Sequence, residues 1–109
     1  MCGIIGKVGV GNVFPELING LKNLEYRGYD SAGVAGIIDN RIIRFRQEGR
    51  ISNLEEEILR EKPESLIGIG HTRWATHGSP TKENAHPHIS NDGKFALVHN
   101  GIIENFADL

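Results

Sequence analysis

The chain lacks several features that mark whole classes of protein. It has one cysteine among 109 residues, so no disulfide can form within it and no oxidising compartment is indicated. No apolar run approaches the roughly 18 residues of a membrane-spanning helix. The first residues also lack the basic and apolar regions of a signal peptide. These absences favour a cytoplasmic protein without a membrane partner.

Excess charge of either sign is also missing. The chain has 12 lysine and arginine residues against 14 aspartate and glutamate residues, a net charge of −2 at pH 7. Nucleic-acid binding requires a concentrated basic surface, whereas the basic residues here are scattered. We therefore expect no nucleic-acid partner. A content of 39% hydrophobic and 24% charged residues is typical of a globular domain.

The one cysteine stands at position 2, directly after Met1. By default, such a residue would be a small apolar side chain that begins a strand. If Met1 is removed, however, Cys2 carries both a thiol and a free α-amine. An α-amine with a pKa of about 7.7 to 8.0 can accept the proton of a thiol with a pKa of about 8.5. One processed residue would then supply a nucleophile and its general base.

Hydrophobic periodicity predicts alternating strands and helices. Strands are expected over 2–10, 34–38, 42–47, 66–74 and 95–98, helices over 13–25, 52–62 and 102–109, and a long loop over 75–92. Asn12 is expected to cap the first helix, and Ser52 with Glu55 to form a capping box for the second. Asp39-Asn40 predicts a hairpin between two strands.

This order of elements mixes hairpins with helices, which predicts an α+β layered fold. The last predicted helix has no capping signal. We therefore expect residues 1–109 to be a truncated part of a domain.

Beyond Cys2, four clusters contain side chains that could carry chemistry. They are 26–33 with Arg27, 71–78 with His71 and Arg73, 84–88 with His86 and His88, and 98–105 with His99 and Asn100. The arginines would ordinarily be surface charges. Asn100-Gly101 would most simply be a hairpin turn. Alternatively, the amide of Asn100 and the N–H of Gly101 form an oxyanion hole.

The five histidines could also ligate a metal. No cysteine pair and no helical His-x-x-x-His spacing accompanies them, so we expect no metal site. A non-enzymatic metal or small-molecule binding module remains an alternative.

The blocks 2–6, 26–33, 71–78, 84–88 and 98–105 together resemble the class II, N-terminal-nucleophile (Ntn) glutamine amidotransferases. The resemblance covers essentially the whole chain. The blocks around Arg27 and Arg73 and the block 98–105 are similar to the branch that aminates fructose 6-phosphate to glucosamine 6-phosphate. The terminal Cys-Gly-Ile is shared with other branches, so an amidophosphoribosyltransferase-like glutaminase is an alternative.

The resemblance implies an αββα four-layer sandwich in which Cys2 hydrolyses L-glutamine to glutamate and ammonia without a cofactor. It also implies roles for other residues: Arg73, Thr76 and His77 bind glutamine, Asn100 and Gly101 form the oxyanion hole, Arg27 orders the nucleophile, Trp74 gates the ammonia path, and His86 meets the sugar-binding part of the family.

The resemblance further implies that 1–109 is the N-terminal portion of a glutaminase domain. An acidic residue that binds the substrate ammonium would lie beyond Leu109, and the sugar isomerase domains are absent. Fructose 6-phosphate would bind only through those absent domains, and the full-length protein would be a homo-oligomer. We expect the chain alone to be a weakly active or inactive fragment.

Overall fold

The computed structural model describes residues 2–74, 79 and 81–109. Its α-helices are α1 (Phe14–Asn23) and α2 (Ile51–Glu61), and single 3-10 turns form η1 (Glu25–Arg27), η2 (Lys82–Asn84) and η3 (Phe106–Asp108). Its strands are β1 (Gly3–Val8), β2 (Ser31–Ile38), β3 (Arg41–Glu48), β4 (Ile67–Arg73), β5 (His88–Ile89) and β6 (Ala96–Leu97). Within these residues, no helix is both long enough and apolar enough to span a bilayer.

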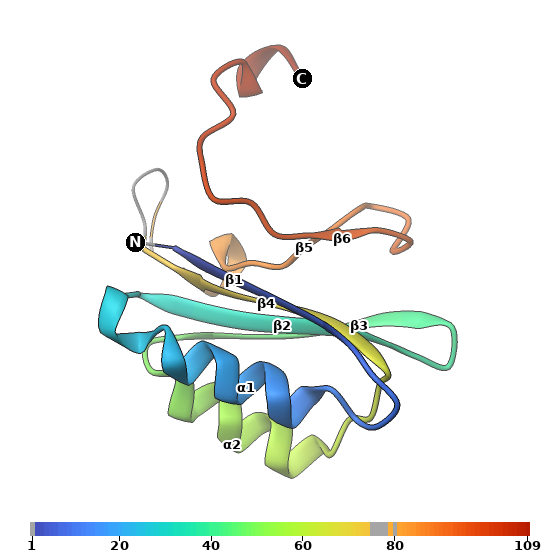
Figure 1. Cartoon of the computed structure of the whole chain (residues 1–109). Coiled ribbons are helices and arrows are strands. Elements are labelled where there is room, and N and C mark those ends of the chain that lie inside the picture. Colours follow the sequence, from blue (N-terminus) through green and yellow to red (C-terminus); the bar gives the residue numbers. More distant parts are fainter. Residues whose placement is uncertain (1, 75–78, 80) are drawn as a thin grey trace.

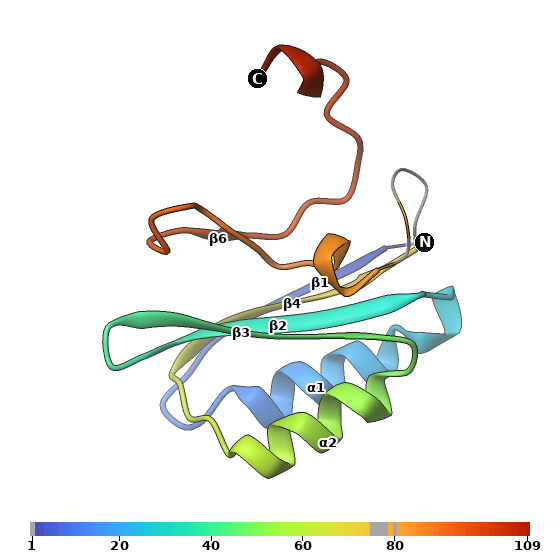
Figure 2. The same ribbon diagram turned by 180° about the vertical axis from the view of Figure 1, so that it is seen from behind.

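Four strands form an antiparallel sheet in the order β1-β4-β2-β3, and β5 pairs with β6 in a separate hairpin. The two α-helices lie side by side on one face of the sheet (Figure 1). The chain from η2 onward runs over the opposite face, as the reverse view shows (Figure 2). The fold is therefore α+β, as predicted. Because Gly3 pairs with Thr72, the residue before β1 lies beside the end of β4.

The core lies between the helices and the sheet. Phe14, Leu17 and Leu21 of α1 are completely buried, and burial of each such side chain stabilises the fold by about 1.5–3 kcal/mol. Two glycines of β4 let α1 approach the strand closely. A Cβ at Gly68 would lie 2.6 Å from Cδ1 of Leu17, and one at Gly70 would lie 3.4 Å from Cδ2 of Leu21. The side chains of α1 therefore occupy the space that side chains at these two positions of β4 would need.

Asn12 ties the start of α1 to the segment that enters β4. Its Oδ1 accepts hydrogen bonds from the N–H groups of Phe14 (3.3 Å) and Ser65 (3.1 Å), and its Nδ2 donates to the carbonyl of Pro63 (3.0 Å). The N-cap residue of α1 is Val13, which makes no side-chain cap, so the predicted cap at Asn12 is wrong by one residue. Asn12 instead links the first helical residue to a distant loop.

The predicted hairpin between β2 and β3 is confirmed. Asp39 and Asn40 have φ values of 52° and 62°, the left-handed pair that a type I′ turn requires.

The predicted capping box at Ser52 is wrong. The second helix begins one residue earlier, at Ile51, and its N-cap residue Arg50 makes no side-chain cap. Ile51 is completely buried in the core. Burying an isoleucine stabilises a fold by about 1.5–3 kcal/mol, whereas a cap contributes about 1 kcal/mol, so packing decides where the helix starts.

The C-terminal part departs most from the sequence prediction. The strand expected over 95–98 shrinks to β6, and Phe95 and Leu97 are exposed instead of buried. Residues 102–109 form only η3, with Ile102 and other apolar side chains exposed. A helix of eight residues is marginal without an apolar surface to pack against, and no layer of the described chain covers this segment.

Candidate active site

Cys2 lies at the corner where β1 starts and β4 ends. Its Sγ accepts a hydrogen bond from the backbone N–H of Trp74 (3.4 Å) and donates to the carbonyl of Trp74 (3.8 Å). The N–H of the following residue, Gly3, donates to Oγ1 of Thr72 (3.1 Å). Cys2 itself is half-buried and its thiol is free. The sulfur is thus held against the backbone of β4 while remaining accessible.

The side-chain amide of Asn100 bridges the cysteine and the sheet. Its Nδ2 donates to the backbone carbonyl of Cys2 (3.2 Å), and its Oδ1 lies 2.7 Å from Nε2 of His71. Asn100-Gly101 joins no pair of strands in the described chain, because η3 is the next element after β6. The hairpin-turn interpretation is therefore wrong, and the two residues lie beside the thiol-bearing residue instead.

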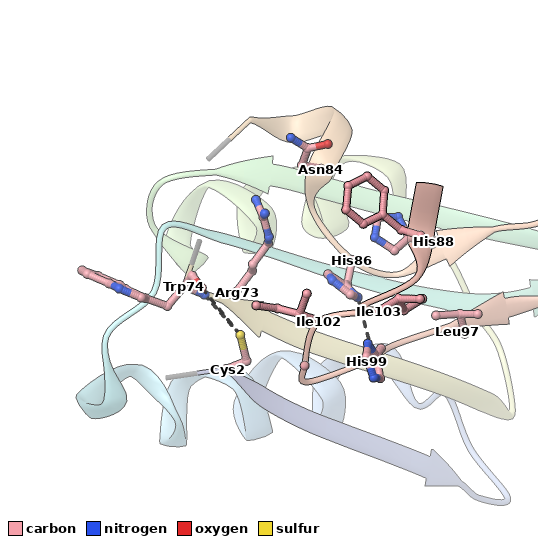
Figure 3. Close-up of a pocket in the computed structure, with 12 residues that line it drawn as sticks. Cys2, Arg73, Trp74, Asn84, His86, His88, Leu97, His99, Ile102 and Ile103 are labelled. Carbon is pink, nitrogen blue, oxygen red and sulfur yellow. Dashed lines mark hydrogen bonds between the residues drawn. The ribbon is translucent and has the colours of Figure 1, made fainter. Parts of the chain in front are cut away.

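A cavity of about 610 Å³ opens next to Cys2 (Figure 3). Its volume lies within the range of small-molecule sites, about 300–1,000 Å³. The residues that line it come from the N-terminus, the end of β4, the segment from η2 to β5, and the chain from β6 onward: Cys2, Arg73, Trp74, Asn84, His86, His88, Leu97, His99, Gly101, Ile102, Ile103 and Phe106.

Arg73 and Trp74 bring a cation and an aromatic ring to this cavity. Arg73 is only 8% exposed, and its Nη1 donates to the carbonyl of Ser79 (2.9 Å), as does Nδ2 of Asn84 (3.0 Å). The ring of Trp74 lies beside Gly28, 3.7 Å from where a Cβ would stand, and the φ of 79° at this position favours glycine. Trp74 is 51% exposed.

Three histidines stack over the sheet beside the cavity. The rings of His71 and His86 are 4.0 Å apart and nearly parallel, and those of His86 and His88 are 4.3 Å apart. Burial lowers the pKa of His71 to about 4 and that of His86 to about 3, with nearby cationic side chains such as Arg73 adding to both effects. These two rings are therefore neutral at pH 7.

The histidines that the structure describes form no recognisable metal centre. Within residues 2–74, 79 and 81–109, no three His, Cys, Asp or Glu side chains are arranged to hold a metal ion.

Most of the residues singled out from the sequence meet here. Cys2, Arg73, Trp74, His86 and Gly101 line one cavity. Asn100 contacts the backbone of Cys2. Arg27 lies in η1 and is not among the residues that line the cavity. Thr76 and His77 lie outside the described residues.

His71 and Asn84 fall in two of the clusters singled out from the sequence, but neither was predicted to act at the glutamine site, to which both belong. A signal for His71 was present, because residues two apart on a strand share one face and Arg73 had been singled out. Asn84 follows no comparable pattern, since η2 lies in a segment without periodicity.

No family model matches the chain. It is 60% identical over 109 residues to a glutamine–fructose-6-phosphate aminotransferase (isomerising) of Mesorhizobium japonicum, and 58% identical to that of Brucella abortus. Each match covers the whole chain but only 18% of the relative.

Solved structures show the same fold. A structure of the allosteric regulatory enzyme of purine biosynthesis superimposes with a TM-score of 0.66 and 26% identity, over 82% of this chain and 19% of that one. A glutamine phosphoribosylpyrophosphate amidotransferase of B. subtilis gives a TM-score of 0.64 at 24% identity, over 84% and 20% of the two chains. By sequence, the chain is therefore similar to part of the glutamine–fructose-6-phosphate aminotransferases, and by fold to part of these two solved structures, and it spans about a fifth of the length of each.

Proposed function

We propose that this chain is the N-terminal portion of the glutaminase domain of a glutamine–fructose-6-phosphate aminotransferase, with Cys2 as its nucleophile. The observation that carries the proposal is the position of the thiol, held by the backbone of Trp74 at the wall of a cavity that Arg73 also lines. Identity of 58–60% to relatives of that name, against 26% to the purine enzyme, favours the sugar-aminating branch.

In the proposed reaction, the α-amine of processed Cys2 takes the thiol proton, and Sγ bonds to the side-chain amide carbon of glutamine. The negative charge that develops on the amide oxygen is stabilised by Nδ2 of Asn100 and the N–H of Gly101. The carbon–nitrogen bond then breaks, the nitrogen takes the proton and ammonia leaves. Water cleaves the resulting thioester to glutamate and restores the thiol. Every step is an acyl or proton transfer, so no cofactor is required.

The other roles come from the resemblance to the glutamine amidotransferases. Arg73, which lines the cavity, is suited to bind the α-carboxylate of glutamine, because a buried, planar guanidinium donates two parallel hydrogen bonds. By the same resemblance, Thr76 and His77, which lie outside the described residues, would bind glutamine, and Arg27 would order the loop near the nucleophile. Trp74 lies beside the sulfur, where ammonia would depart, and His86 meets the sugar-binding part of the protein.

The amination step belongs to the rest of the protein, since the chain spans about a fifth of the relatives' length. Fructose 6-phosphate would bind there and receive the ammonia, in a cytoplasmic homo-oligomer.

Glutamine turnover by residues 1–109 alone is expected to be slight. The sheet face opposite the helices exposes Ile37 and Ile67, which line an open groove of about 280 Å³ together with the exposed Phe95 of the segment that runs over this face. An apolar surface of this kind is usually covered by further protein. Turnover comparable with that of the full-length protein would contradict this expectation.

A test of the nucleophile uses the full-length protein with glutamine or free ammonia as the nitrogen source. Cys2→Ala should abolish glutamine-dependent product formation and leave ammonia-dependent amination intact, because only the first reaction needs the thiol. The ammonia reaction serves as an internal control for folding. Glutamine-dependent turnover that survives Cys2→Ala would show that the assigned nucleophile is wrong.

The general base is tested separately by mass spectrometry of the intact protein. The proposal requires a molecule lighter by one methionine residue, because an acylated nitrogen at Cys2 would have no basicity. An active protein that retains Met1 would exclude the α-amine as the base.

A further inference from the structure

The orientation of the Asn100 amide follows from its two neighbours. A backbone carbonyl can only accept hydrogen bonds, so the group of Asn100 that lies 3.2 Å from the carbonyl of Cys2 is the donor Nδ2. The amide oxygen therefore faces Nε2 of His71, 2.7 Å away. Because this oxygen is an acceptor, Nε2 carries the proton.

The other ring nitrogen of His71 supports the same tautomer. His71 is completely buried, and its Nδ1 has no hydrogen-bond partner among the described residues. Because Nε2 already carries a proton, a second proton on Nδ1 would bury an imidazolium cation, which costs more than burying a neutral nitrogen without a partner. The bare nitrogen of a neutral imidazole avoids placing a charge there. His71 is therefore a neutral imidazole whose Nε2–H donates a hydrogen bond to Oδ1 of Asn100.

The two residues differ in how firmly their backbones are held. His71 lies on β4 between two strands and pairs with Ile4 on one side and Gly33 on the other. Its ring also stacks on that of His86 at 4.0 Å. Asn100 lies in a segment without regular structure, between β6 and η3. The terminal torsion of an asparagine is soft, so an anchored partner is needed to keep its amide in one orientation.

We propose that His71 is the positioning residue of the oxyanion hole: its Nε2–H holds the oxygen of Asn100 so that Nδ2 stays turned toward the nucleophile. The inference rests on the proposed function, because it assigns Nδ2 of Asn100 to the oxyanion. His71 itself touches no reacting atom. It acts only through Asn100.

Two substitutions of His71, each by a side chain that ends in an amide, distinguish a positioning role from a packing role. In His71→Gln the longer amide places an N–H near the position of Nε2, whereas in His71→Asn the shorter amide cannot reach it. In the full-length protein, His71→Asn should lower the kcat for glutamine hydrolysis by about 10- to 100-fold, since a misplacement of about 1 Å can cost about 100-fold. His71→Gln should recover most of this loss. The KM for glutamine should change little in both variants.

Equal kcat losses in the two variants, with the thermal stability of each retained, would overturn the inference. A rise in KM with kcat unchanged would also overturn it, because the residue would then act on binding. Cys2→Ala separates this failure from failure of the proposed function. If Cys2→Ala abolishes glutamine hydrolysis and His71→Asn does not slow it, only the positioning role is wrong.

A measurement on the unmodified full-length protein covers the case in which the variants fail to fold. Nitrogen-15 NMR of the His71 imidazole should show a neutral ring protonated on Nε2 throughout pH 6–8. Protonation on Nδ1, or a charged ring in this range, would overturn the inference, because Nε2 would lack its proton or Nδ1 would carry one.

Discussion

The backbone carbonyl of His86 lies directly against the Cα of Gly33, with no space between them for a side chain. Gly33 is in the middle of β2, and the segment that ends in β5 crosses the sheet at this point. Arg46 of β3 holds the same segment by donating to the carbonyls of Glu83 (3.0 Å) and Ala85 (3.2 Å). The position of His86 in the cavity wall therefore requires a residue without a side chain at Gly33.

Replacing Gly33 with alanine should displace this segment. The new methyl group would collide with backbone atoms, which cannot rotate away as a side chain can, and overpacking of this kind costs about 1–3 kcal/mol. Urea unfolding of the protein should report that loss. Gly11→Ala is the matched control, because a Cβ there would meet no atom within 4 Å. Equal stability of the two variants would contradict the contact.

Substitution of Arg73 by lysine should raise the KM for glutamine by about tenfold or more, because hydrogen bonds to charged groups contribute about 1.5–3 kcal/mol and lysine cannot form the bidentate pair. Steady-state kinetics of the full-length protein would measure this change. Arg60→Lys, at an exposed position of α2, is the control. An unchanged KM for Arg73→Lys would remove Arg73 from the carboxylate site.

Stability should fall as the pH is lowered from 6.5 toward 4. Burial lowers the pKa of His71 to about 4 from 6.5, so in this window the unfolded chain binds a proton that the folded chain does not. The stabilisation is complete above pH 6.5 and is lost as the pH falls to the folded pKa. Denaturant unfolding at several pH values should show that the free energy of unfolding falls less steeply between pH 6.5 and 4 for His71→Gln than for the unmodified protein. An equally steep fall for the two proteins would mean that His71 titrates normally.

Loss of the Asn12 side chain should loosen the junction of α1 with the loop before β4. Asn12→Ala removes three hydrogen bonds and leaves part-buried backbone groups without partners, at a cost of about 1–3 kcal/mol. Thermal unfolding measures the effect, with Asn23→Ala at an exposed position of the same helix as control. If both variants melt at the same temperature, the three contacts contribute nothing to stability.

Periodicity predicted the part of the fold in which one face of each element is buried. The two helices and the four long strands follow their apolar patterns, and the Asp39-Asn40 turn follows from residues that tolerate positive φ. The prediction fails over 95–109, where apolar side chains such as Phe95 are exposed. Hydrophobic spacing predicts an element only where something in the fold covers its apolar face.

The site was predictable as residue types but not as contacts. A cysteine at position 2 and an arginine at the end of a strand suggest chemistry by themselves. No local rule brings Asn100 to the carbonyl of Cys2, across 98 positions of sequence. That contact depends on β1 pairing with β4 and on the last segment crossing the sheet, which are long-range features. The contacts between the histidine rings could not be predicted from the sequence either, since His71 lies on β4 and the other two rings come from a stretch without periodicity.

The place of β1 in the sheet has a consequence for synthesis on the ribosome. β1 is an edge strand whose neighbour, β4, is made some sixty residues later. At translation rates of about 5–20 residues per second, the nascent amino end waits several seconds without its strand partner. An aminopeptidase that removes Met1, as the proposed function requires, can therefore act before β1 pairs with β4.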